Sequence, residues 1–255
     1  MNILIFITGD CHGNVERFMN STFPEQQCMT KNDYIIICGD FGLVWNYSGE
    51  IEEEKYWLNW LDSRNFTTLF VDGNHENFER LNKYPVEEWN GGKVHKIRSS
   101  VMHLMRGELF EIGGKSFFTF GGAASHDIED GILDMDEDGK WKITTIQWME
   151  MGKRFRIRNL DWWDRELPSS EEIEHGLKNL KNKEYKVDYV ITHCAPQTIV
   201  SSSLTRQDTP NILTNYFDEL AHRVKFKKWF FGHYHGDKTI FGKFELLYER
   251  MIRID

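Results

Sequence analysis

The sequence predicts an α/β protein in which a mixed sheet, or two sheets, is covered by helices. Short β-branched or aromatic runs recur along the chain, and continuous apolar runs of this length indicate strands buried on both faces. Segments with helical spacing lie between these runs, and this alternation is typical of α/β layers. The 255 residues, 40% of them hydrophobic, are enough for one large domain or two small ones.

Five predicted strands each run abruptly into a Gly, Asp, Asn or His. Further strands are expected one after another in 101–121 and 238–254, with turns at Gly113-Gly114 and Gly242-Lys243. The five runs are ILIFIT (3–8), YIIIC (34–38), TLFVD (68–72), VDYVIT (187–192) and KWFF (228–231).

Four segments place apolar residues on one side of a helix. The second follows Ser48 and has an acidic first turn, and the third follows a capping box formed by Ser169 and Glu172. The apolar faces are Val15, Phe18 and Met19; Ile51, Leu58 and Leu61; Ile173, Leu177 and Leu180; and Leu213, Phe217, Leu220, Ala221 and Val224.

Charge and composition exclude several classes of protein. The formal net charge of −9 argues against a general binder of nucleic acid or membranes, because such proteins need a basic face; a local basic patch is compatible with it. No run of 18 apolar residues is present, so no membrane span is expected. The opening MNILIFIT lacks the basic start of a signal peptide, and the four cysteines form no CxxC pair. We expect a cytoplasmic protein with reduced thiols.

The ends of the predicted strands carry a set of residues that can bind metals. Ligands of α/β sheets bind outside the carboxyl ends of the strands, and carboxylate, imidazole and amide groups suit Mn, Fe, Zn or Ni. Two cations about 3.5–4 Å apart can clamp the attacking and leaving oxygens of a phosphoryl displacement. The glycines that precede four of these residues allow sharp turns. The set is Asp10, His12, Asp40, Asn74, His75, His193, His233 and His235.

Taken one at a time, these residues have simpler interpretations. A strand-end Asp is usually a helix cap or a turn residue, Asn74 alone fits a turn, and His193 alone fits a hydrogen-bonded edge position. The pair His233 and His235 in FFGHYH favours metal more strongly, because an extended segment would send both side chains to one face. The occurrence of all of them at strand ends favours one shared site.

Five motifs in order, GDCHGN (9–14), GDFG (39–42), GNHE (73–76), THCAP (192–196) and GHYH (232–235), resemble the signature of the calcineurin-like metallophosphoesterases. The resemblance covers essentially the whole chain. It implies a single domain, 1–255, folded as a four-layer α/β/β/α sandwich with mixed β-sheets around a dinuclear metal centre.

The resemblance also implies a role for each residue. One metal would be held by Asp10, His12, Asp40 and His235; the other by Asp40, Asn74, His193 and His233, with Asp40 bridging. The catalytic residues would be Asp40 and His75, and His75 would contact the substrate phosphate with Asn74 and protonate the leaving oxygen. The cofactors would be two divalent metal ions, with Mn first and Fe, Zn or Ni as alternatives.

One motif departs from the family pattern. Many members, including the Ser/Thr protein phosphatases, continue the second motif as GDxxDRG, whose Arg grips phosphate, whereas this chain has GDFGLVW. Arg154, Arg156 and Arg158 alternate in RFRIRN, so Arg156 and Arg158 are candidate substrate contacts. The alternative is a solvated face paired with the acidic run 128–139. We expect 121–167 to form a cap or insert, with His126 and Asp127 as further candidates and Trp162 and Trp163 in packing.

The predicted function is hydrolysis of phosphate mono- or diesters by metal-bound hydroxide. Alternatives are a dinucleoside polyphosphate hydrolase, a protein phosphatase and, in another class, a non-catalytic scaffold that binds proteins. A scaffold has no need for His75 beside a complete ligand set. The expected substrate is a small phosphate ester or nucleotide, and the acidic balance disfavours long nucleic acids.

Overall fold

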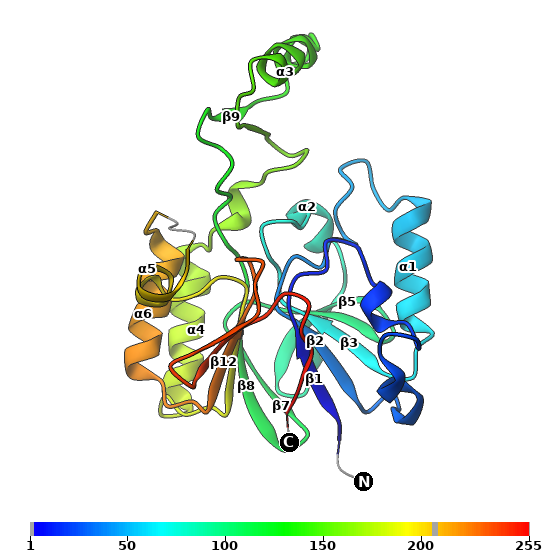
Figure 1. Ribbon diagram of the computed structural model, residues 1–255, viewed down its shortest axis with the longest axis vertical. Helices are drawn as coiled ribbons and strands as arrows, with labels where there is room; N and C mark the ends of the chain where they lie inside the picture. The colour runs from blue at the N-terminus through cyan, green and yellow to red at the C-terminus, as the bar shows by residue number, and fades with distance from the viewer. Residues whose placement is uncertain (1–2, 206–208, 255) are drawn as a thin grey trace.

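Two β-sheets lie face to face in this computed structural model, and helices cover the outer face of each sheet (Figure 1). The structure describes residues 3–205 and 209–254. One sheet has seven strands and the other has six, and both contain parallel and antiparallel pairs. The four-layer sandwich with mixed sheets is therefore confirmed.

The seven-stranded sheet has a parallel centre formed by β1, β2, β3 and β6, with antiparallel strands at both edges. Three of the five predicted strands, β1, β2 and β3, are adjacent here. In spatial order the strands are β15 (Ile252–Ile254), β1 (Ile5–Thr8), β2 (Tyr34–Ile37), β3 (Thr67–Phe70), β6 (Val101–Leu104), β5 (Gly92–Arg98) and β4 (Val86–Trp89).

The six-stranded sheet has the same plan, with parallel central strands and antiparallel edges. It contains the other two predicted strands, β11 and β12. The consecutive strands expected in 101–121 exist but are divided, because β6 joins the first sheet and the β7–β8 hairpin joins the second. In order, its strands are β13 (Lys238–Ile240), β14 (Phe244–Leu246), β12 (Lys228–Phe231), β11 (Tyr189–Thr192), β8 (Lys115–Phe120) and β7 (Glu108–Ile112).

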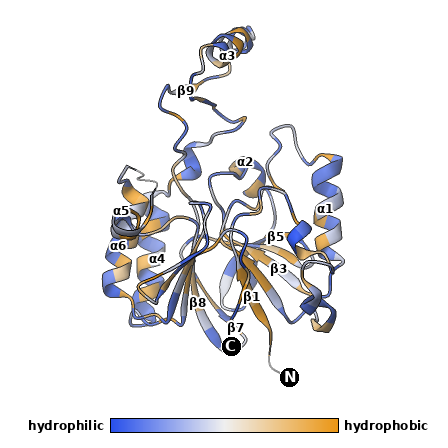
Figure 2. Ribbon diagram, viewed as in Figure 1, coloured by the Kyte–Doolittle hydropathy of each residue, from blue (hydrophilic) through white to orange (hydrophobic). Residues whose placement is uncertain are grey.

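Three hydrophobic cores separate the four layers, and the central strands contribute to two cores each (Figure 2). In β2, Ile36 packs between the sheets, whereas Ile35 and Ile37 pack under the outer helices. The same alternation places Phe230 between the sheets and Trp229 beneath the helices on the opposite side. Unbroken apolar runs in the sequence therefore correspond to strands that are buried on both faces.

Helices on the two outer faces follow most of the predicted periodicities. The capping box before α4 is present, since Ser169 N donates to Glu172 Oε2 (2.8 Å) and Glu172 N donates to Ser169 Oγ (3.2 Å). The predicted helix near Val15 is only one 3₁₀ turn. The seven-stranded side carries η1 (Glu16–Phe18), η2 (Pro24–Cys28), α1 (Glu52–Asp62) and α2 (Phe78–Leu81); the other carries α4 (Ser170–Asn182), α5 (Gln197–Ser203) and α6 (Ile212–Arg223).

The region 121–167 contains an arm that projects away from the sandwich (Figure 1). It consists of β9 (Ile132–Leu133), α3 (Lys140–Glu150) and β10 (Arg156–Ile157), and η3 (Asp164–Glu166) follows it. The helix α3 was not anticipated from the sequence. Within the described ranges, none of the helices combines the length and the apolar character needed to cross a membrane.

Candidate metal centre

The carboxyl ends of five parallel strands, three from one sheet and two from the other, meet at one edge of the sandwich. The loops after β1, β2 and β3 carry Asp10, Asp40 and Asn74, and those after β11 and β12 carry His193 and His233. All five side chains are buried. The site therefore lies between the two sheets, and both sheets contribute residues to it.

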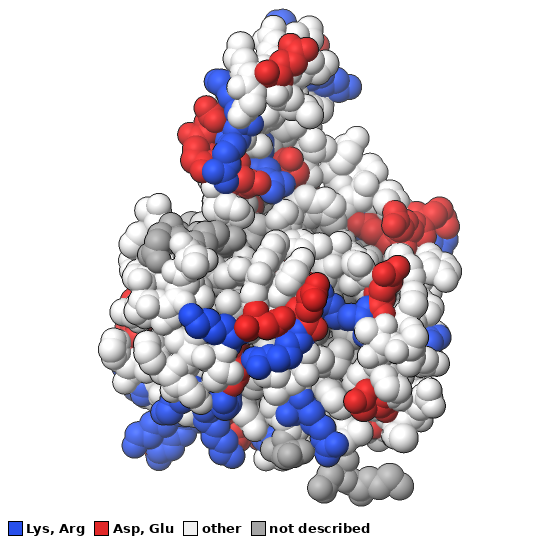
Figure 3. Space-filling model, in the orientation of Figure 1, with Lys and Arg blue, Asp and Glu red and all other residues white. Residues whose placement is uncertain are grey.

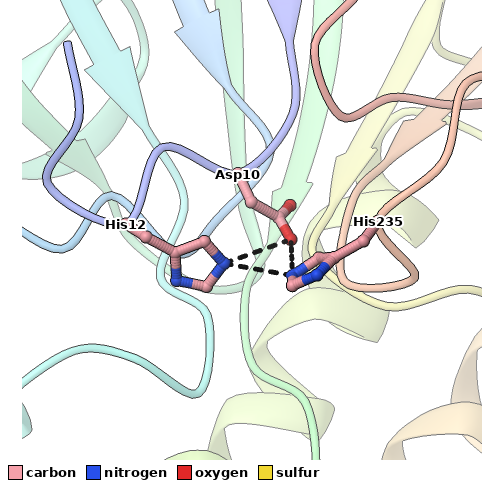
Figure 4. Close-up of side chains that lie close together, drawn as sticks. All are labelled: Asp10, His12 and His235. Atoms are coloured by element: carbon pink, nitrogen blue, oxygen red, sulfur yellow. Dashed lines mark hydrogen bonds and ion pairs between the residues drawn. The ribbon is translucent and has the colours of Figure 1, made fainter.

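Asp10, His12 and His235 form the first group of candidate ligands, and their side chains point toward one another (Figure 4). His12 Nε2 and His235 Nε2 are 3.1 Å apart. Asp10 Oδ2 lies 3.3 Å from His235 Nε2 and 3.9 Å from His12 Nε2. The backbone N–H of His233 donates to Asp10 Oδ1 at 3.0 Å, which orients the carboxylate.

Asp10, Asp40 and His193 form a second, fully buried group. His193 Nε2 lies 3.2 Å from Asp40 Oδ1 and 3.3 Å from Asn74 Oδ1. The other ring nitrogen of His193 is 2.8 Å from the carbonyl oxygen of Cys38, which fixes the ring orientation. Asp40 Oδ2 is also 3.7 Å from His12 Nε2, so Asp40 lies between the two groups.

The chemistry of these donors fits divalent cations. Two imidazole nitrogens and a carboxylate oxygen converge in the first group. All three atoms can act as acceptors, so their close contacts need a proton or a cation between them. Burial by itself would lower the pKa of His193, but Asp40 and Asp10 raise it to about 10. A site that holds a proton so firmly has a negative potential that also favours a metal ion.

His75 lies beside both groups, and its backbone N–H donates to Asp40 Oδ1 at 2.8 Å. Its ring is 5.0 Å from the ring of His12 and 5.2 Å from that of Trp45. Burial lowers the pKa of His75, and the nearby His12 and Arg156 act in the same direction against the opposing effect of Asp40. His75 also forms a third group of possible metal ligands with His12 and Asp40.

His233 and His235 reach different parts of the site, but not in the way predicted. The ring of His233 lies 5.0 Å from that of His193, and the ring of His235 lies 5.1 Å from that of His12. The expected extended conformation is wrong, because φ is +67° at His233 and +47° at His235. A left-handed turn, and not strand alternation, presents the two side chains to the site.

Four of the candidate ligands have a strained backbone. Besides these two histidines, His12 and Asp40 have positive φ, of +47° and +45°. Non-glycine residues in this region cost about 1–3 kcal/mol each when the surrounding structure enforces them. Gly73 and Gly232 allow the close approach, since a Cβ there would lie 2.1 Å from Asp40 Oδ1 and 1.9 Å from Asp10 Oδ1.

Glu76 was not singled out from the sequence, although it ends the GNHE motif. It is fully buried and accepts the N–H groups of Phe41 (2.6 Å) and Gly73 (2.5 Å). It therefore ties together the loops that carry Asp40 and His75. Burial, with the charge of Asp40, raises the pKa of Glu76 to about 8.

Arg17 is a second residue that sequence reasoning missed. Its guanidinium donates to the backbone oxygens of Asp10, at 2.8 Å, and Tyr248. The ring of Tyr248 stacks on His235 at 4.7 Å. Arg17 thereby connects the loop after β1 with the segment that supports His235. The local sequence gave no signal of this role, because one of the two partners, Tyr248, lies 231 positions away.

The candidate substrate contacts lie at the base of the arm and within it. Arg156 pairs with Asp127 (2.6 Å) and acts electrostatically on His75. Arg158 pairs with Asp134 and Asp164 at 2.7 and 2.5 Å, so two carboxylates already balance its charge. Their partners come partly from the acidic run, as the alternative interpretation expected.

The neighbouring residues of that segment have other contacts. The His126 ring lies 6.3 Å from the ring of His233. Trp163 is buried, with its ring 5.3 Å from that of Trp45, which in turn contacts His75. Trp162 packs under Arg158. Trp163 therefore belongs to the aromatic packing behind His75.

A hollow of about 220 Å³ opens beside His12, between the loop after β2 and the start of α1. Trp45 and Trp57 contribute to its wall, and Glu53 is an acidic residue on it. Figure 3 shows acidic side chains gathered where α1 begins. The full lining is His12, Gly13, Gly42, Leu43, Trp45, Asn46, Ile51, Glu53, Glu54 and Trp57.

Comparison with known proteins supports the motif-based expectation. The family model described as calcineurin-like phosphoesterase matches residues 3–237. Lariat debranching enzyme A of Xenopus laevis is 24% identical over 169 residues, which are 61% of this chain and 30% of that protein. The lariat debranching enzyme of Danio rerio is 21% identical over 256 aligned positions, covering 91% of this chain and 40% of that protein. The chain thus spans less than half the length of these relatives.

A solved structure with a related arrangement is phosphopantetheinyl hydrolase from Mycobacterium tuberculosis. It superposes with a TM-score of 0.44 at 13% sequence identity, and the alignment covers 97% of this chain and 90% of that chain.

Proposed function

Because this chain belongs to the calcineurin-like phosphoesterase family and is a hydrolase of phosphoric esters, we propose that it cleaves small phosphate mono- or diesters at a dinuclear metal centre. The observation that carries this proposal is the convergence of Asp10, Asp40, His12, His193 and His235 in groups of three whose ligand atoms lie within 4.8 Å of one another. Two of these groups have Asp10 in common and two have Asp40 in common, and such overlapping groups suit two cations better than one.

The residues divide into two sites with Asp40 between them. Asp10, His12, Asp40 and His235 hold one cation; Asp40, Asn74, His193 and His233 hold the other. Bound divalent cations supply Lewis-acid stabilisation of the charge on the phosphoryl oxygens. Mn²⁺ is the first choice, because carboxylate, imidazole and amide donors without thiolate suit it, and Fe, Zn and Ni fit the same donors.

The protein itself positions the ester and moves a proton. His75 contacts the phosphate and donates a proton to the leaving oxygen, and Trp45 and the backbone bond to Asp40 hold it in place. Arg156 adds positive charge near His75. It takes the phosphate-binding role of the Arg in the GDxxDRG motif, which this chain lacks.

The hollow beside His12 receives the alcohol part of the ester. Its two tryptophans offer flat apolar surfaces for an aromatic group, such as a nucleobase or an aryl group. Acidic residues at the start of α1 repel a long polyanion, which favours a small substrate over a nucleic-acid strand.

The test is hydrolysis of p-nitrophenyl phosphate and bis-p-nitrophenyl phosphate by metal-stripped protein titrated with Mn²⁺, with bound metal counted in parallel. Turnover that needs metal, with two metals per chain, is expected. Asp40→Asn should lose both metal and activity, whereas His222→Ala, an exposed histidine on α6, should keep both. Full metal binding without hydrolysis of any phosphate ester would support the scaffold alternative.

Trp57→Ala tests the hollow separately. It should raise KM for aryl or nucleoside esters about tenfold and leave small alkyl phosphates unaffected, because the indole touches only the alcohol part of the ester. An equal loss for aryl and alkyl esters would contradict this placement.

A further inference from the structure

The helix α3 at the tip of the arm lies far from the sandwich and has no buried residue (Figure 1). A helix of 11 residues is marginally stable in water unless other residues pack against it. One side of the helix packs on its own arm, where the ring of Trp148 contacts that of Phe155 at 5.1 Å and lies under Lys153. The other side faces solvent.

The outer face of α3, defined by Lys142, Ile143, Ile146, Met149 and Glu150, is apolar at its centre. Successive helical residues are about 100° apart, which places these five within about 120° of one another with Ile146 in the middle. The side chains of Ile143, Ile146 and Met149 are 61%, 58% and 67% exposed. Figure 2 shows that this remote helix contains hydrophobic as well as hydrophilic residues.

The charges on the outer face are arranged symmetrically about Ile146. Lys142 lies four residues before it and Glu150 four residues after it. Among residues 3–205 and 209–254, neither of the two makes an ion pair. A twofold axis through Ile146 would place Lys142 opposite Glu150 of an identical helix running antiparallel, and Ile143 opposite Met149. The face is thus complementary to itself.

We propose that the outer face of α3 pairs with the same face of a second copy of this chain. A membrane fits less well, because the acidic stretch 134–138 immediately precedes the helix and opposes an anionic bilayer. Two single helices bury less surface than the interface of a typical stable complex, so the dimer is reversible, with Kd on the order of micromolar.

The experiment is sedimentation velocity of the full chain, from roughly 1 to 300 μM, around the expected Kd. The wild type should shift from monomer to dimer, and I146D should remain monomeric. K142E alone and E150K alone each place like charges opposite each other and should raise Kd about tenfold. The double variant K142E/E150K should recover the wild-type Kd, and a mixture of the two single variants should form heterodimers.

K178E, which changes an exposed charge on α4, is the matched control and should leave Kd unchanged. Far-UV circular dichroism checks that every variant is folded. A wild type that stays monomeric up to the highest concentration overturns the proposal. So does a double variant as weak as the single variants, because antiparallel charge pairing then has no role. Flotation with vesicles of neutral and anionic lipid completes the test: a monomer that binds vesicles through Ile146 has a membrane as its partner.

Discussion

Two opposing influences act on the imidazole of His75. Burial lowers its pKa, and the carboxylate of Asp40 raises it, with a net lowering. The backbone bond to Asp40 and the Trp45 ring hold it next to the candidate ligands without using its ring nitrogens in a bond to either residue. The proton donor that we propose needs a ring nitrogen that is not used by neighbouring residues in this way.

His75→Ala should lower kcat by about 10²–10⁴, the usual contribution of general acid–base catalysis, while the two metals remain bound. Metal analysis and steady-state kinetics on the same preparation check this. Loss of one metal in the variant would show that His75 is a ligand instead.

Glu166 gives a second prediction at this scale, concerning stability. Burial raises the pKa of Glu166 to about 8, although Ser125 donates to both of its carboxylate oxygens. Because the folded-state pKa lies above the unfolded value, the stabilising contribution is complete below about pH 4.5 and is lost as pH rises to about 8.

The glutamine in Glu166→Gln cannot ionise. The free energy of unfolding of this variant, minus that of the wild type, should therefore rise by about 3–5 kcal/mol between pH 4.5 and pH 8.5. Urea unfolding of metal-free protein across this range measures the difference. A constant difference at all pH values would mean that Glu166 is already ionised at low pH.

The sequence predicted which residues lie together where a side chain can bind metal and also follows the end of a strand. Asp10, Asp40 and His193 meet these conditions and lie together, as expected. Arg17 and Glu76 support the site through backbone atoms of Tyr248 and Phe41, which are 231 and 35 positions away, and such contacts leave no pattern in the local sequence.

At the scale of elements, the start of α1 depends on one buried carboxylate. Glu54 accepts the N–H groups of Trp45 (2.9 Å) and Asn46 (2.8 Å) and pairs with Arg80 (2.8 Å). It therefore fixes the loop after β2, which forms one wall of the hollow, to the helix that forms the other.

Glu54→Ala should lower the free energy of unfolding by about 3–5 kcal/mol, since it leaves a buried Arg80 without its partner. Glu52→Ala is the matched control: its side chain is 92% exposed, and the change should stay within about 0.5 kcal/mol. Urea denaturation of both variants checks this, and equal midpoints would show that the loop holds its position without Glu54.

The sequence predicted elements well where the core determines them and poorly elsewhere. β1, β2, β3, β11 and β12 are buried on both faces and produced continuous apolar runs. The α3 helix buries no residue and its apolar face is exposed, and the exposed strand β4 lies at an edge of its sheet, so the core determines neither element. The strands of 101–121 belong to two different sheets because of tertiary packing, and the local sequence contains no pattern that predicts this.

Across the whole molecule, the candidate centre joins the two sheets. Asp10 and Asp40 belong to loops of one sheet and His193 to a loop of the other, so a cation bound among them would connect both halves of the sandwich. A ligand at 1,000 times its Kd stabilises a fold by about 4 kcal/mol, which for a chain of this size is roughly 10 °C.

Chelation should therefore lower the midpoint of thermal unfolding by about 10 °C, and adding Mn²⁺ back should restore it. Differential scanning calorimetry measures both steps. Asp40→Asn should unfold at the same temperature with and without metal. A wild type that is equally insensitive would show that the centre does not bridge the sheets.

The hydrogen bond from the backbone of His233 to Asp10 joins residues 223 positions apart. During synthesis, the loop that carries Asp10 leaves the ribosome long before the loop that carries His233, so the site cannot close until more than 200 further residues have been added. Contacts this distant also slow folding, because a long stretch of chain must be ordered before they form. The full set of candidate ligands can thus come together only after residue 235 has been synthesised.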